Sequence, residues 1–460
     1  MSETPLAAEE KLDFKRILPI FVIVLVDLLG LTIIIPLLPL YATAFGASPF
    51  VIGLLAAAYP MMQFLGAPVL GRLSDRYGRK PVLIISQIGT FAGFLLLGFA
   101  NALWLIFISR LIDGISGANI ATAQAAISDS TTEKTRTQGL GLIGAAFGLG
   151  FIIGPVIAFV SLALTDNDYR VPAFAAATFS LFSIILTSTW FKETLTAEKR
   201  QRDGKKVTLN LSALVTAVKH PAVGLLLVLI FMKQFAFGGF EQMLALFTLN
   251  RLGLNASGNA GVFVFVGIIV VTVQAGLIGR WSRKYGDRKL VYAGLGLLAI
   301  GLTLMGFTPH QPVPWYSEAE LVEELTSTAD GSGQSSSSDI PVELPNEADS
   351  SYWGLAWLLV MLIPTGIGGG ILQPAINSLI TKRVAANEVG GMLGISASFF
   401  SGANALAPII GGGLFEALGS TAPFIFWGSI MAILLYVTLR YLKPGREETA
   451  VPGLSRGSAH

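Results

Sequence analysis

Five ionisable residues interrupt long apolar runs of this sequence: Asp27, Arg110, Asp113, Lys233 and Glu241. A charged side chain is costly in hydrocarbon unless it faces protein or water, so such residues mark functional sites. A carboxyl group removed from water holds its proton more readily, which suits reversible proton exchange. These residue types therefore indicate a site that binds a proton, a cation or a polar substrate inside an apolar protein.

Arg110 and Asp113 lie three residues apart, on one face of a helix, where they can form an ion pair. The pair is either a neutralised structural element or a specialised charge site. The internal repeat described below holds no second copy, because its corresponding positions are Leu362 and Thr365. This asymmetry favours the specialised site.

Asp27 and Lys233 occupy nearly corresponding positions in the two halves of the chain, since the repeat relates Asp27 to Phe235. We therefore expect them to present opposite charges to one central cavity and to exchange partners when a proton or cation binds. Glu241 lies about two helical turns further along. There it either carries a proton or lines an outer vestibule.

The composition requires a membrane. Of 460 residues, 53% are hydrophobic and only 13% charged. Apolar runs of about 20 residues recur along nearly the whole chain, and each can cross a bilayer as a helix. We predict an all-α polytopic membrane protein with about 12 transmembrane helices in two pseudo-symmetric six-helix bundles. A β-barrel is disfavoured, and an enzyme is the least favoured class because no catalytic or metal-binding pattern is present.

Lysine and arginine gather in alternate connections between the apolar runs, and the positive-inside rule places those connections in the cytoplasm. Residues 1–16, before the first span, do not resemble a cleaved signal peptide. The protein is thus expected in the cell membrane with both termini cytoplasmic. The formal net charge of +2 is too small to indicate a nucleic-acid partner.

The segment GRLSDRYGRK at 71–80 aligns without gaps on GRWSRKYGDR at 279–288, an offset of 279 − 71 = 208 residues. Such self-similarity indicates two parallel halves that rock about a central site. The expected parts are a cytoplasmic segment 1–16, a bundle 17–191, a cytoplasmic linker 192–221, a bundle 222–441 and a cytoplasmic tail 442–460.

Residues 308–352, between two spans of the second half, are rich in aspartate, glutamate and serine. We expect a disordered acidic extracellular linker, in preference to an element that gathers cations or binds a partner.

The repeated ten-residue loop carries both signs of charge, whereas a loop that only fixes orientation needs positive charge alone. The embedded Asp75 therefore indicates a gate whose ion pairs cross a cytoplasmic closure and break on inward opening. The expected gating residues are Gly71, Asp75, Arg76, Gly78, Arg79, Gly279, Arg283, Gly286 and Asp287.

The loop at 71–80 resembles the signature between spans two and three of the major facilitator superfamily. Two further sets of residues resemble that family's RxxxGxxxA pattern and the glycine-rich motif of its drug:proton antiporters: Arg110, Gly114 and Gly117 in span four, and Gly144, Gly148, Gly150, Gly154 and Pro155 in span five. Span one, with Asp27 before the stretch IPLLP at 35–39, looks like the first helix of tetracycline-efflux and multidrug proteins.

The resemblance implies a proton-coupled antiporter that exports amphiphilic drugs or similar small molecules by alternating access, with a proton gradient as energy source and no cofactor. It implies that Asp27 is the substrate or proton acid, that Arg110 tunes its protonation, and that span five controls leakage. The expected partners are a small-molecule substrate, protons and lipid, and we expect a functional monomer. The alternatives are a transporter of a metabolite or lipid-like solute and, less favoured, a non-transporting receptor or scaffold.

The expected cavity combines aromatic walls with sparse polar groups, which suits bulky amphiphiles better than sugars. Its candidate lining residues are Gln124, Gln234, Phe235, Gln373, Asn377, Phe399 and Asn404. Tetracycline exporters carry an acid in span nine and a histidine in span eight, whereas residues 290–307 hold no charge here and the histidines stand in loops or the tail. Tetracycline itself is therefore a doubtful substrate.

Overall fold

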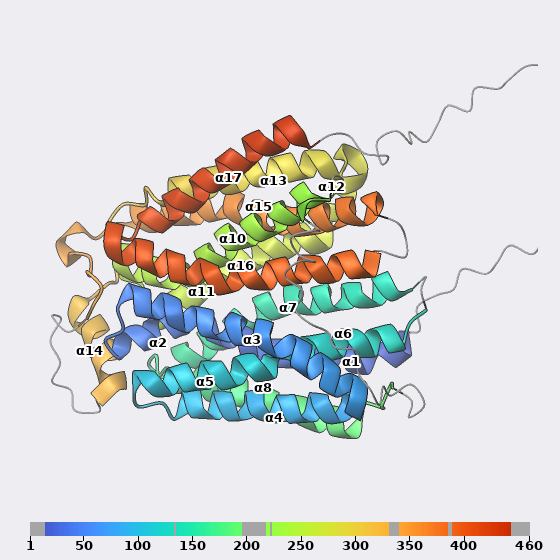
Figure 1. The fold of residues 1–460 in the computed structure, drawn as a ribbon. Helices are drawn as coiled ribbons and strands as arrows, with labels where there is room; N and C mark the ends of the chain where they lie inside the picture. Colours follow the sequence, from blue (N-terminus) through green and yellow to red (C-terminus); the bar gives the residue numbers. More distant parts are fainter. Residues whose placement is uncertain are drawn as a thin grey trace, which may run out of the picture.

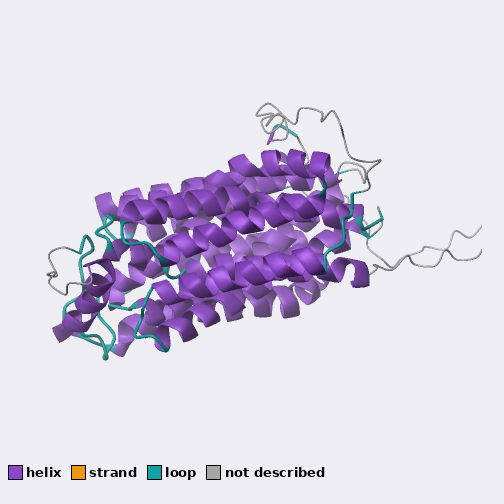
Figure 2. Cartoon of the chain, turned by 90° about the horizontal axis from the view of Figure 1, so that it is seen from below, coloured by secondary structure: helices purple, strands orange, loops and turns teal. Residues whose placement is uncertain are grey.

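A computed structural model describes residues 14–132, 135–195, 218–220, 223–330, 340–384 and 389–442. This part of the chain is helical and contains no strand (Figure 2). Twelve of its helical segments are long and apolar enough to cross a membrane. The predicted all-α polytopic fold is confirmed. The terminal residues 1–13 and 443–460, and linker residues 196–217 and 221–222, lie outside the described residues.

The first half of the chain supplies six spans. They are α1 (Phe14–Ile34), α3 (Pro49–Tyr77), α4 (Arg79–Gly98), α5 (Leu103–Ser116) continued through a 3-10 turn by α6 (Ile120–Asp129), α7 (Arg136–Ala163) and α8 (Arg170–Thr189). The short helix α2 (Leu38–Ala44) follows α1 after a turn at Pro36. Proline lacks an N–H and disfavours helical geometry in the residue before it, which explains why the first span stops at Ile34.

The second half repeats this arrangement. Its spans are α10 (Gly224–Leu252), α11 (Ala256–Val271) joined by a π-helical turn to α12 (Ile278–Tyr285), α13 (Asp287–Met305), α15 (Tyr352–Arg383), α16 (Val389–Leu418) and α17 (Ala422–Tyr441). Both copies of the repeated loop turn sharply at a glycine, Gly78 with φ of +105° and Gly286 with φ of +82°. Only glycine adopts such angles without strain, so these two positions in the repeat are explained by the backbone.

The helices pack mainly within their own half. In the first bundle α1 lies against α7 and α8, and α4 against α5 and α8; in the second, α13 lies against α15 and α17, and α10 against α16. Two long contacts join the bundles, α3 along α16 and α7 along α11 (Figure 1). These four helices therefore form the main interface between the two bundles.

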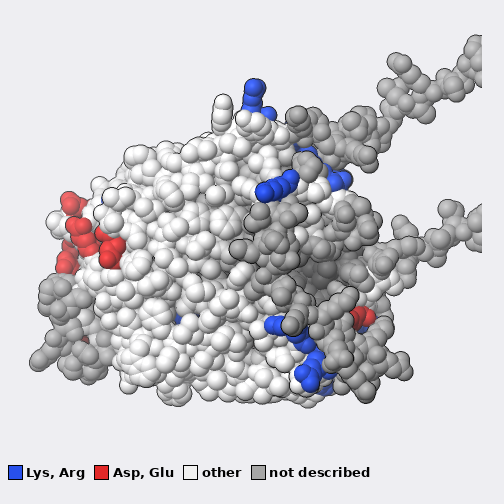
Figure 3. Space-filling model, in the orientation of Figure 1, with Lys and Arg blue, Asp and Glu red and all other residues white. Residues whose placement is uncertain are grey.

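Charge divides the molecule into two ends. Figure 3 shows acidic side chains gathered at the end that carries α14 (Glu318–Asp330), and basic side chains at the opposite end. We call these the acidic end and the basic end. Both repeated loops lie at the basic end, which the positive-inside rule assigns to the cytoplasm.

The expectation of a disordered acidic linker at 308–352 is wrong for much of that segment. Residues 318–330 form α14, which contacts α2, and its Leu321 and Leu325 are buried in the main apolar core. Val342 is also buried. Although α14 is acidic in composition, Leu321 and Leu325 are spaced four residues apart and therefore lie on one face of the helix. This apolar face packs against the core. Residues 331–339, including the serine run, lie outside the described residues.

Candidate functional site

Asp27 lies on α1 among apolar residues of the first bundle. Asn119, in the 3-10 turn between α5 and α6, donates a hydrogen bond of 2.9 Å from its side-chain nitrogen to Asp27 Oδ2. The other carboxylate oxygen, Oδ1, is buried and has no hydrogen-bond partner in the described part of the chain. The only polar partner of this carboxyl group among the described residues is therefore a neutral amide.

Arg110 and Asp113 form the ion pair that their spacing predicts. Arg110 Nη1 lies 3.1 Å from Asp113 Oδ2, and both side chains are 2% exposed. The guanidinium also lies 5.5 Å from the centre of the Phe94 ring, within the range of a cation–π contact. Breaking such a buried pair by removing one partner leaves an uncompensated charge, so the pair is a fixed feature of the bundle.

Asp27 and Asp113 line the same small cavity. Its volume is about 10 Å³, close to the space that one water molecule needs, and Tyr59 and Thr90 also border it. A Cβ on Gly117 would lie 2.4 Å from the Tyr59 hydroxyl, so glycine is needed for Tyr59 to reach this place. Two acidic side chains therefore meet at one polar cavity inside the first bundle.

The glycine-rich stretch of α7 lies directly against α1. A Cβ on Gly154 would lie 2.1 Å from Thr32 Oγ1, and one on Gly150 would lie 3.5 Å from Leu28. These contacts fall within about two turns of Asp27. A Cβ on Gly144, in contrast, would meet no atom within 4 Å apart from the backbone of its own helix, and one on Gly148 would lie 3.6 Å from Gln274 of the second bundle. Within the glycine-rich motif, the close packing against α1 therefore involves Gly150 and Gly154.

Lys233 lies in the second bundle, 4% exposed, and donates a hydrogen bond of 3.0 Å to Gln234 Oε1. Gln234 in turn donates to Asn404 Oδ1 at 2.7 Å, which joins α10 to α16. The expected facing of Asp27 and Lys233 is not found, because no contact joins them among the described residues and each bonds within its own bundle. Glu241 is half-buried on α10.

The other candidate lining residues divide by environment. Phe235 is buried and stacks on Phe231, whose ring meets Phe399 edge-on. Gln373 and Asn377 are half-buried on α15. Gln124 is exposed on α6. Of these candidates, Gln234 bonds directly to Lys233, and Asn404 is joined to it through Gln234.

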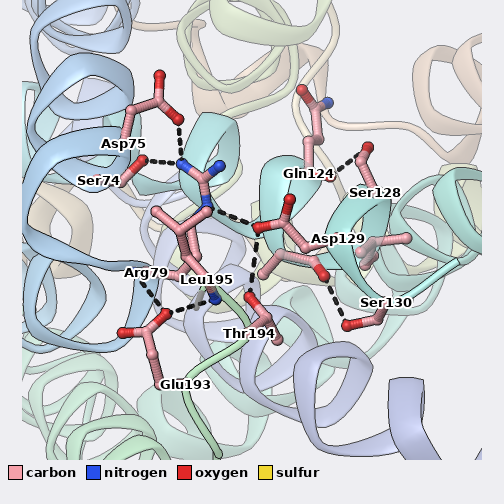
Figure 4. A network of polar contacts seen from close by, with 12 residues as sticks. Ser74, Asp75, Arg79, Gln124, Ser128, Asp129, Ser130, Glu193, Thr194 and Leu195 are labelled. Carbon is pink, nitrogen blue, oxygen red and sulfur yellow. Dashed lines mark hydrogen bonds and ion pairs between the residues drawn. The ribbon is translucent and has the colours of Figure 1, made fainter. Parts of the chain in front are cut away.

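The first repeated loop forms a polar network centred on Arg79 (Figure 4). Its guanidinium donates to Asp75 at 2.6 Å, to Ser74 at 2.7 Å and to Asp129 at 2.9 Å. Glu193 accepts hydrogen bonds from the backbone N–H of Arg79 and of Lys80. Every member belongs to the first half, so this network holds spans two, three and four together rather than crossing to the other bundle.

The second repeated loop has a matching network around Asp287. This carboxylate accepts hydrogen bonds from Lys382 and Ser378, both at 2.6 Å, and from Ser282. These residues all belong to the second half. At the basic end the described ionic networks therefore stay within their bundles.

Close contacts join the two bundles at the acidic end. A Cβ on Gly53 of α3 would lie 2.3 Å from the carbonyl oxygen of Pro408 on α16. The backbone N–H of Phe50 donates a hydrogen bond of 2.9 Å to Glu416. Since α3 and α16 belong to different bundles, the acidic end is closed in this structure.

Comparison with known proteins decides the family. The model of the Major Facilitator Superfamily matches residues 20–322 and 340–458. The chain belongs to the Major Facilitator Superfamily. It is 30% identical over 397 residues to the class B tetracycline resistance protein of Escherichia coli, covering 85% of this chain and 86% of that protein. It is 27% identical over 418 residues to Multidrug resistance protein 1 of Bacillus subtilis (strain 168), covering 90% and 93%.

The human organic anion transporter MFSD10 (TETRAN) has a similar solved structure, with a TM-score of 0.58 and 22% identity over 92% of this chain and 99% of that chain. The expected superfamily, its fold and its drug-efflux relatives are thus confirmed. This Major Facilitator Superfamily protein is a multi-pass membrane transporter.

Two polar residues of the site escaped prediction from the sequence. Asn119 and Tyr59 border or bond the acidic groups of the first bundle, yet neither carries charge. The signal for Asn119 is its amide side chain inside an apolar span, where an unpaired amide is costly. Uncharged polar side chains inside apolar spans, and not only charged ones, therefore indicate site residues such as Asn119.

Proposed function

We propose that this Major Facilitator Superfamily transporter is a proton-coupled antiporter that exports amphiphilic small molecules across the cell membrane. Its basic end faces the cytoplasm, it works as a monomer, and a proton gradient supplies the energy without a cofactor. Its tetracycline-resistance and multidrug-resistance relatives support the choice of export.

The observation that carries this proposal is the difference between two carboxyl groups at one cavity. Asp113 has a cationic partner, Arg110, at 3.1 Å, whereas the hydrogen-bond partner of Asp27 is the neutral Asn119. Protonating Asp113 would break an ion pair and leave a buried cation. Protonating Asp27 breaks none. Asp27 is therefore the proton carrier, and Asp113 with Arg110 forms the fixed charge pair beside it.

The helix contacts give this proton a way to influence transport. Asp27 lies on α1, which packs on the glycine stretch of α7, and α7 runs along α11 of the other bundle. A change in charge at Asp27 alters the packing of α1 on α7 and so shifts one bundle against the other. The acidic end closes while substrate enters from the cytoplasm, and opens for release and proton uptake.

The test uses purified protein in liposomes with an imposed pH gradient. Lumenal pH is followed as lipophilic cations, organic anions, tetracyclines and sugars are added one at a time. Proton flux triggered by amphiphiles and not by sugars supports amphiphile:proton antiport. Proton flux triggered only by sugars, or movement of amphiphiles with no proton flux, contradicts it.

A further inference from the structure

Three basic side chains are buried in the part of the chain that the structure describes: Arg79 at 6% exposure, Arg110 at 2% and Lys233 at 4%. Arg79 contacts the carboxylates of Asp75 and Asp129, and Arg110 contacts that of Asp113. No described carboxylate oxygen lies within 4.0 Å of Lys233, which makes it the exception of the three. A buried charge without a counter-charge is costly, so its presence requires an explanation.

The described groups in direct contact with the Lys233 ammonium are polar or aromatic and uncharged, and Glu241 acts on it only from beyond ion-pair distance. Its ammonium donates one hydrogen bond to Gln234 Oε1, and it lies 5.0 Å from the ring centre of Phe237 and 5.9 Å from that of Phe400. An ammonium group carries three N–H donors, and ring faces attract a cation but accept no full counter-charge. The group therefore retains the capacity to bind an anion.

Glu241, the carboxyl group on the same helix, does not act as a close counter-charge for Lys233. Glu241 lies eight residues from Lys233, about 12 Å along α10, and forms no ion pair with it. Asp27 bonds to Asn119 in the other bundle. Asp113 pairs with Arg110, so none of the three described intramembrane acids forms a close ion pair with Lys233 in this state.

Two described rings, Phe237 of α10 and Phe400 of α16, lie within cation–π range of the lysine, and further rings lie on the same two helices. Phe231 and Phe235 of α10 stack with ring centres 6.3 Å apart, and Phe231 meets Phe399 of α16 edge-on at 6.3 Å. The bond from Gln234 to Asn404 supplies neutral polar contacts between the same helices. One cation, two amides and several rings suit a ligand with one acidic group and an apolar aromatic body.

We propose that Lys233 and the rings around it on α10 and α16 bind the acidic group and the apolar body of an amphiphilic organic anion, which makes such anions the preferred substrate class. This inference rests on the transport function proposed above and narrows it. The ammonium pairs with the carboxylate or sulfonate of the substrate, and Phe237 and Phe400 keep water away from that pair. Substrate release returns Lys233 to its present neutral partners.

The proposal is tested with three probes that share one ring system and differ in charge: 1-naphthaleneacetate, 1-naphthaleneacetamide and 1-naphthylethylammonium. Each is titrated by calorimetry into the full-length protein in lipid nanodiscs at equal pH on both sides. The expected result is that the acetate binds at least about tenfold more tightly than the amide and the ammonium, as one unscreened ion pair would produce.

Two variants of Lys233 test whether this side chain causes the preference for the acetate probe. Lys233→Met should reduce the acetate-to-amide ratio to within about threefold, whereas Lys233→Arg, which keeps the charge, should retain most of it. Lys284→Met is the matched control, because Lys284 also faces a ring, that of Tyr285 at 5.2 Å, but at the exposed basic end. It should leave the ratio unchanged.

An acetate that binds no more tightly than the other two probes overturns the proposal, whether all three bind strongly or weakly. A preference for acetate that survives in Lys233→Met overturns it too. Because the measurement uses no pH gradient, its outcome is separate from that of proton coupling. Tighter binding of the ammonium probe would be compatible with proton-coupled antiport but would contradict the proposal that organic anions are the preferred substrates.

Discussion

Glu324 accepts a hydrogen bond of 2.8 Å from the phenol of Tyr169, although the two residues lie 155 positions apart. Glu324 belongs to α14, and Tyr169 immediately precedes α8 of the first bundle. The same carboxylate oxygen accepts from the backbone N–H of Ala256, at the start of α11 in the second bundle, at 3.4 Å. One side chain of the acidic loop thus bridges both bundles at the closed end.

This bridge predicts that closure of the acidic end depends on pH. Burial raises the pKa of Glu324 to about 7, against the opposing hydrogen bonds from Tyr169, Ala256, Asn255 and Asn167. These facing groups are a phenol, a backbone N–H and two amides. When the end opens, water restores the ordinary pKa of the glutamate. Closure is therefore favoured while Glu324 is protonated, and is weakened as pH rises through about 7.

Spin labels on Asn101→Cys and Phe307→Cys, which are exposed at the acidic end, report this opening, and the native chain has no cysteine to interfere. The open fraction should increase severalfold between about pH 5 and pH 8. Glu324→Gln, which mimics the protonated form, should remove that dependence. An identical pH response in Glu324→Gln would rule out the bridge as its cause.

The substitution Tyr169→Phe removes the hydrogen bond to Glu324 and keeps the aromatic ring. Tyr169 is fully buried and its ring lies 5.7 Å from that of Tyr41, so phenylalanine keeps the packing. Losing the bond to Glu324 should destabilise the closed state by about 1 kcal/mol. The same spin labels should show more of the open state at acidic pH. An unchanged distribution would mean that the phenol contributes nothing to closure.

Gly154→Ala should disturb the contact between α7 and α1. The added Cβ would lie 2.1 Å from Thr32 Oγ1 and 2.8 Å from the backbone carbon of Thr32, which cannot move away as a flexible side chain would. We expect the free energy of unfolding to fall by about 1–3 kcal/mol, measured by thermal unfolding in detergent. Gly144→Ala is the control on the same helix, because a Cβ there would meet no atom within 4 Å apart from the backbone of that helix. Equal stability of the two variants would argue against tight packing at Gly154.

Asp75→Asn should slow transport without weakening substrate binding. The amide still accepts a hydrogen bond from Arg79, but the negative charge at 2.6 Å from the guanidinium is lost. Because the network lies at the basic end, away from the proposed binding residues, kcat should fall severalfold while KM stays nearly constant. Arg72→Gln is the control, since Arg72 is exposed and bonds to the carbonyl of Pro68 on its own helix. A large rise in KM with normal kcat would contradict a gating role.

Local patterns account for what the sequence could predict. Apolar runs determine the spans, and the spacing of Arg110 and Asp113 determines their pairing, because both depend on neighbours along one helix. The facing of Asp27 and Lys233 depends instead on the exact register between the two halves of the repeat. Lys233 stands two positions from the residue that the repeat assigns to Asp27, and two residues turn a side chain by about 200° around a helix. That rotation directs Lys233 to another face of α10.

Other parts of the site depend on contacts between distant segments. Asn119 reaches Asp27 because a 3-10 turn interrupts span four, which no hydropathy pattern reveals. The role of α14 was missed because its acidic composition resembles that of a disordered segment, although Leu321 and Leu325 give it a docking face. The burial of these two leucines holds α14 against the core despite the acidic residues around them.

The central claim, that Asp27 carries the coupling proton, is tested most directly by comparing two fluxes in Asp27→Asn proteoliposomes. Asparagine keeps the size of the side chain and a hydrogen bond with Asn119 but cannot release a proton. We predict that substrate exchange without a pH gradient persists, while uptake driven by a pH gradient falls to the level of protein-free liposomes. Normal gradient-driven uptake in this variant would contradict the account and place the proton on another residue.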